Sequence, residues 1–73
     1  MVDITTMSLK EKMQYARSLV HQRRATVSLE LKDEVISVIN RSETNEECRN
    51  AMEALIKDPQ ASLTAIIRLS YEE

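Results

Sequence analysis

The sequence predicts an all-α protein, a small bundle of three to four short helices that we expect to be dimeric. Its 73 residues include no Gly, Phe or Trp and a single Pro, whereas β-sheets normally use Gly in turns and aromatic residues in strand pairs. Leu, Ile, Ala, Met, Glu, Lys and Arg, all common here, favour helices. We expect residues 1–7 to form a flexible arm and residues 8–73 a single helical domain.

The small size of the chain limits how it can be stabilised. A chain this short buries only about 60% of its unfolded surface. Cys48 is its only cysteine and His21 its only histidine, so an internal disulfide is excluded and a structural zinc is not expected. We therefore expect no metal or cofactor, and we expect additional stability to come from association with a second copy or a partner.

The densest apolar segment spans residues 28–40, and we expect the other helices to pack around it. Six apolar side chains there cover nearly half of a helix circumference: Leu29, Leu31, Val35, Ile36, Val38 and Ile39. Ser28 is a suitable N-cap, and Glu30 adds a negative charge to the first turn, where the helix dipole favours it.

Capping signals place the other helices. Ser8 with Glu11, and Thr44 with Glu47, both fit the capping box that begins a helix. We expect Arg23 and Arg24 to lie in the last turn of the first helix, where positive charge is favourable. Cys48 falls on the apolar side of the third helix, which indicates a buried side chain rather than a reactive thiol.

Asp58 and Pro59 mark the start of a fourth helical segment, because Asp is a good N-cap and Pro suits the first helical position. The pattern leaves open whether this segment continues the third helix through a kink. Its apolar surface is too wide for so small a bundle to bury. We expect it to form an isologous dimer interface with the central helix, through Val35, Ile39, Leu63, Ile66 and Ile67.

Charge is distributed unevenly along the chain. Residues 1–24 carry a net charge of +3 and residues 25–73 a net charge of −5. Within the first helix, helical spacing gathers a basic stripe of five residues, Lys10, Gln14, Arg17, His21 and Arg24. This stripe is either a docking surface for an acidic partner or a phosphate backbone, or an ordinary solvated face whose charge balances acidic neighbouring helices.

No enzymatic chemistry is indicated. His21 and Cys48 lie 27 positions apart on different expected helices, and a chain without Gly contains no Gly-rich phosphate loop. We expect a non-enzymatic protein-interaction, adaptor or regulatory protein. A small helical chain without catalytic groups would suit an accessory protein of a phage or other mobile element that modulates a host partner.

The alternative is a small dimeric nucleic-acid-binding regulator that uses the basic stripe to contact phosphates. A net charge of −2 weakens this second interpretation. We expect a cytoplasmic protein, because the chain has neither a signal-peptide pattern nor a run of about 20 apolar residues that could span a membrane.

Overall fold

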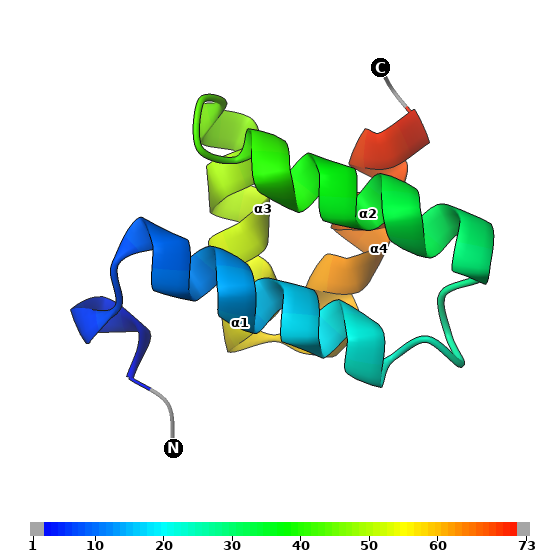
Figure 1. Ribbon diagram of the computed structural model, residues 1–73, viewed down its shortest axis with the longest axis horizontal. Helices are drawn as coiled ribbons and strands as arrows, with labels where there is room; N and C mark the ends of the chain where they lie inside the picture. The colour runs from blue at the N-terminus through cyan, green and yellow to red at the C-terminus, as the bar shows by residue number, and fades with distance from the viewer. Residues whose placement is uncertain (1–2, 72–73) are drawn as a thin grey trace.

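The computed structural model describes residues 3–71, and this part of the chain is helical with no strand. The predicted all-α fold is therefore confirmed. A short 3-10 turn, η1, precedes four α-helices (Figure 1), whose bounds are Ile4–Thr6 for η1, Leu9–Gln22 for α1, Leu29–Arg41 for α2, Glu46–Lys57 for α3 and Pro59–Tyr71 for α4.

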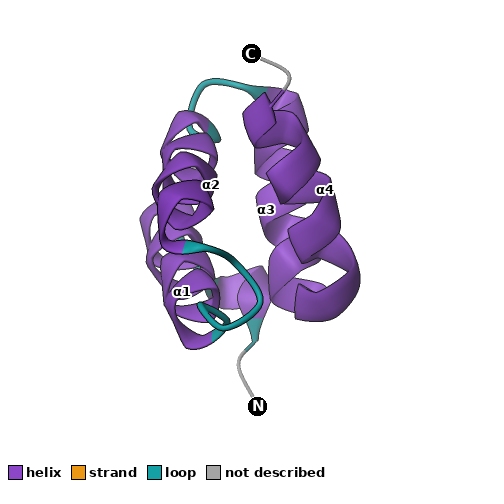
Figure 2. Cartoon of the chain, turned by 90° about the vertical axis from the view of Figure 1, so that its right-hand side faces the viewer, coloured by secondary structure: helices purple, strands orange, loops and turns teal. Residues whose placement is uncertain are grey.

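The four helices form two layers. Helices α1 and α2 lie on one side and helices α3 and α4 on the other (Figure 2). Helices α2 and α3 each pack against the other three helices. Helix α2 therefore shares with α3 the central position that its apolar pattern predicted.

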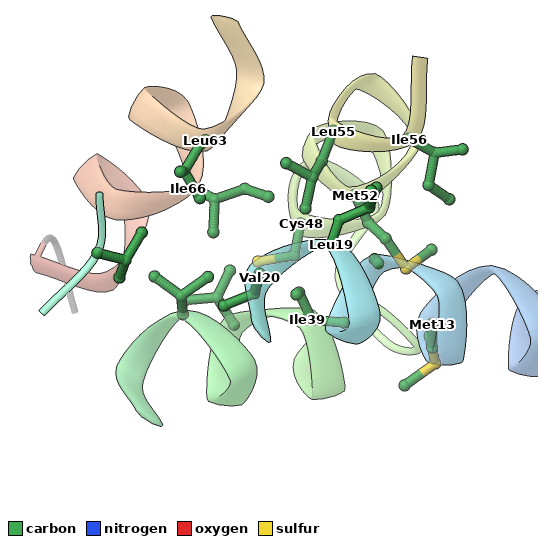
Figure 3. Packing of buried hydrophobic residues seen from close by; sticks show 14 residues of the cluster. Met13, Leu19, Val20, Ile39, Cys48, Met52, Leu55, Ile56, Leu63 and Ile66 are labelled. Carbon is green, nitrogen blue, oxygen red and sulfur yellow. The ribbon is translucent and has the colours of Figure 1, made fainter. Parts of the chain in front are cut away.

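The core is aliphatic and draws on every helix (Figure 3). Val35, Val38 and Ile39 of α2 are at most 1% exposed, whereas Leu29 is 71% exposed. The apolar face of α2 is thus narrower than the sequence indicated. The buried hydrophobic residues are Met13, Ala16, Leu19, Val20, Val27, Val35, Val38, Ile39, Cys48, Met52, Leu55, Ile56, Leu63 and Ile66.

Two predicted N-caps are confirmed. The Ser8 hydroxyl oxygen accepts the Glu11 backbone N–H at 3.2 Å, and the Ser28 hydroxyl oxygen accepts the Leu31 N–H at 3.2 Å. Both serines have extended backbone dihedrals, which direct the side chain back over the first turn. Each cap therefore satisfies a backbone donor that has no partner within its own helix.

Two helix boundaries differ from the prediction. Helix α1 ends at Gln22 with Arg23 as its C-cap, so Arg23 and Arg24 lie beyond its last turn. Helix α3 is capped by Asn45 rather than Thr44, because Asn45 Oδ1 accepts the N–H groups of Glu47 and Cys48. The Thr44 hydroxyl instead donates to a carbonyl at the end of α2.

Helices α3 and α4 are separate, which settles the junction that the pattern left open. Asp58 has φ −140° and ψ 85°, so the backbone leaves the helical region there. Its carboxylate oxygen accepts the Ala61 N–H at 3.4 Å, and Pro59 occupies the first position of α4 as predicted. The residue before a proline disfavours helical dihedrals, which explains the break.

The first residues described form a turn beside the core. Asp3 caps η1, and the Thr5 hydroxyl and N–H that donate to its carboxylate lower the pKa of that group. Ile4 is partly buried against the core and Met7 is half-buried. Residues 1 and 2 of the expected arm lie outside the described part of the chain.

Ile39→Val should lower the free energy of unfolding by about 1 kcal/mol, because it removes a methylene group from a fully buried position. Leu29→Ala is the control: it removes more atoms, yet it should change stability by less than about 0.5 kcal/mol because Leu29 is exposed. Urea denaturation followed by circular dichroism measures both. A larger loss for Leu29→Ala would contradict this core.

Asn45→Ala should destabilise the protein by about 1 kcal/mol, since two N–H groups of α3 lose their acceptor. Thr44→Ala should have an effect below about 0.5 kcal/mol, because Thr44 caps no helix. Thermal denaturation of the two variants compares them directly. A larger loss of stability for Thr44→Ala than for Asn45→Ala would indicate that Thr44 is the N-cap of α3.

Candidate functional site

The basic stripe lies along the surface of α1 and the turn that follows it. Lys10, Gln14, His21 and Arg24 are exposed, and Arg17 is half-buried. Helical spacing puts the first four stripe residues on one flank of α1, and Arg24 continues the stripe past the helix end. The structure therefore leaves all five side chains at the protein surface.

Arg17 is the stripe residue most firmly held by the fold. Its Nη2 donates to Asn40 Oδ1, so this flank of α1 borders α2, which lies alongside it (Figure 1). Its Nε is buried and makes no hydrogen bond within residues 3–71. A buried donor without an acceptor is unfavourable, so this placement of Arg17 has a cost in folding free energy.

A hollow of about 250 Å³ opens beside Arg17. It is lined by Lys10, Met13, Gln14, Arg17 and Glu43. Two cations, an amide and a thioether surround a single carboxylate, so the lining has a net charge of +1. Its volume is below the roughly 300–1,000 Å³ of small-molecule pockets, which suits one inserted side chain better than a cofactor.

The turn between α2 and α3 holds Glu43 at this hollow. Arg49 of α3 donates from Nη2 to the Glu43 carbonyl oxygen at 3.0 Å and from Nε to the Ser42 carbonyl oxygen at 3.4 Å. The Ser42 hydroxyl is buried and donates to the Ile39 carbonyl oxygen at 2.5 Å. These bonds satisfy carbonyl groups at the end of α2, so the turn is fixed without Gly.

A second basic residue of α1 has a different role. Lys12 Nζ lies 2.8 Å from Glu53 Oε1 of α3, so these two side chains form an ion pair between the helices. The hydrogen bond from Lys12 lowers the pKa of the Glu53 carboxyl, although desolvation opposes it. Charge balance with an acidic helix thus involves Lys12, which is not part of the basic stripe.

The five residues expected at a dimer interface are distributed differently. Val35, Ile39, Leu63 and Ile66 lie in the core of a single chain, at 4% exposure or less. Their side chains pack against other helices of the same chain, so they are not available at the surface for a second copy. Ile67 is half-buried at the surface of α4. Four of the five expected interface residues are thus core residues of the single chain, and self-association stays a prediction.

The thiol of Cys48 and the imidazole of His21 lie in different environments. Cys48 is buried, as predicted, and His21 is exposed on α1. Among residues 3–71, no three His, Cys, Asp or Glu side chains are grouped to hold a metal ion. Within the same range, no helix has the length and apolar character needed to cross a bilayer.

The lining residues Met13 and Glu43 were not predicted as part of the site. No sequence signal brings the loop residue Glu43 to Lys10, because that proximity depends on the α2–α3 turn. No protein-family model, no curated protein and no solved structure matches the chain. The surface residues themselves therefore carry the functional inference.

Glu53→Gln should lower the free energy of unfolding at pH 7 and have less effect at acidic pH. The folded pKa of Glu53 is lowered, so its stabilising effect is present above the unfolded pKa and is lost as pH falls through the folded pKa. The pair is partly exposed, so the loss at pH 7 should stay below about 1 kcal/mol. Urea denaturation from pH 7 to pH 3 measures it.

Glu34→Gln, at an exposed position on α2, is the matched control and should show no comparable difference at pH 7. The stability difference between the wild type and Glu53→Gln should shrink on acidification. A constant difference across this range would contradict the ion pair between α1 and α3.

Proposed function

We propose that this protein is a non-enzymatic protein-binding module that docks an acidic segment of a partner on the basic stripe of α1. The observation that carries the proposal is the hollow lined by Lys10 and Arg17, whose lining has a net charge of +1. A carboxylate inserted there would meet two cations and the Gln14 amide. Charge-assisted hydrogen bonds of this kind are stronger than neutral ones.

The exposed cations of the stripe are available to a partner. Lys10, His21 and Arg24 make no ion pair or side-chain hydrogen bond within residues 3–71, whereas Lys12 balances the acidic α3. Exposed cations add little affinity individually, but they accelerate the encounter with an acidic partner. Arg17 adds specificity because its position is fixed by Asn40. We expect a moderate, salt-sensitive affinity.

Nucleic-acid binding remains the second candidate, because the same stripe presents Lys10, Arg17 and Arg24 to solvent. Two features favour a protein partner. Glu43 lines the hollow, and it repels the closely spaced phosphates of a polyanion more than it repels one isolated carboxylate. The net charge of the chain is −2, so the chain as a whole does not attract a polyanion. The attraction would have to come from the basic stripe.

The double variant Lys10→Glu with Arg24→Glu should reduce partner capture at least tenfold while leaving the melting temperature nearly unchanged, because both side chains are exposed and make no side-chain hydrogen bond or ion pair within residues 3–71. Lys57→Glu with Arg68→Glu is the matched control, since both side chains are exposed, lie outside the stripe and give the same change in net charge. Tagged protein and variants are used to capture partners from native cell lysate, with and without nuclease, at two salt concentrations.

The result expected is one stoichiometric protein that survives nuclease, is retained by the control and is lost by the double variant. Equal loss in both variants would mean that net charge alone governs capture. Recovery that disappears with nuclease and falls steeply with salt would replace the proposal with phosphate binding. If the double variant loses its folded structure together with partner capture, the stripe serves to balance charge within the chain rather than to bind a partner.

A further inference from the structure

A second hollow, of about 220 Å³, lies where the end of α1 meets α4. It is lined by Arg23, Thr26, Gln60, Leu63, Thr64 and Ile67. Arg23 follows α1 directly as its C-cap, and Thr26 belongs to the turn before α2. The other four residues come from the first two and a half turns of α4. The hollow is separate from the one at Lys10, with which it shares no lining residue.

The lining combines an apolar floor with a polar rim. Ile67 is half-buried and offers aliphatic surface, and the buried Leu63 lies at the base of the hollow with little of its side chain accessible. Arg23 supplies a positive charge, and Thr26, Thr64 and Gln60 supply hydroxyl and amide groups. Within residues 3–71 none of these four polar side chains makes a hydrogen bond or an ion pair, and no acidic residue lines the hollow.

Size restricts the ligand. The hollow is smaller than the roughly 300–1,000 Å³ of pockets that hold small molecules of drug or cofactor size, so it accommodates about one amino-acid residue. A ligand that satisfies both parts of the lining must carry an aliphatic group and a carboxylate within one residue. The C-terminal residue of a peptide has this combination when its side chain is aliphatic.

We propose that this hollow binds the C-terminal aliphatic residue of a partner peptide. The terminal carboxylate meets the Arg23 guanidinium, which is suited to two parallel hydrogen bonds with a carboxylate, and the side chain packs on Leu63 and Ile67. Gln60 and Thr64 are one turn apart on α4, about 6 Å, so they are placed to bond the amide groups of the one or two preceding residues.

The test uses an acetylated tetrapeptide, Ala-Ala-Ser-Leu, with a free C-terminus, titrated into ¹⁵N-labelled protein and followed by NMR. The amide resonances of Thr26, Thr64 and Ile67 should shift in a saturable manner. The same peptide with an amidated C-terminus should bind at least tenfold more weakly, and so should 4-methylpentanoate, which has the aliphatic group and the carboxylate but no peptide.

Arg23→Gln should also weaken binding of the free-acid peptide at least tenfold, whereas Arg68→Gln, an exposed arginine of α4 outside the hollow, should bind like the wild type. Thr64→Glu is a second variant that does not depend on Arg23. It places a negative charge in the rim at an exposed position, so the fold should be retained and the carboxylate repelled.

Three results would overturn the proposal. Equal binding of the amidated peptide would show that no carboxylate is recognised. Equal binding of 4-methylpentanoate would make this a site for free aliphatic acids. An absence of saturable shifts at millimolar peptide would show that the hollow does not bind a peptide end.

Discussion

Aliphatic packing between two helix layers is the constraint on which this structure depends. The chain has no Gly, one Cys and no site for a structural metal among its described residues, so its core must close through helix contacts alone. Helices α2 and α3 each contact the other three helices, and fully buried residues such as Ile39, Met52 and Leu55 lie between the layers. A chain of this size has a small margin of stability, so few of these side chains are dispensable.

The turn between α2 and α3 connects this packing to the surface. Ser42 is fully buried, and its hydroxyl oxygen lies 2.5 Å from the Ile39 carbonyl oxygen and 3.3 Å from Met52 Sδ. Because this polar group is satisfied inside the core, the turn has one well-defined position. Arg49 then donates hydrogen bonds to the carbonyl oxygens of Ser42 and Glu43, which holds Glu43 near α1. The first hollow is thus a consequence of how the core closes.

The sequence predicted local features well and contacts between elements poorly. Ser8 and Ser28 act as N-caps and Cys48 is buried, because each depends on a few neighbouring residues. The choice of Asn45 over Thr44 depends on where α2 ends, which periodicity does not define within a residue or two. The sequence also placed Leu29 on the apolar face of α2, but Leu29 is exposed. An apolar pattern gives the width of a face but not how much of it the neighbouring helices cover.

The basic stripe was visible in the sequence because helical spacing alone defines it, but both hollows depend on tertiary neighbours. Each forms where α1 passes another part of the chain, at the α2–α3 turn near Arg17 and at α4 near Arg23. Six residues separate these two arginines, which places them about 9 Å apart along the helix axis and about 120° around it. One extended segment therefore cannot fill both hollows by following a single face of α1. The two proposed sites are therefore suited to separate partners, or to two separate segments of one partner.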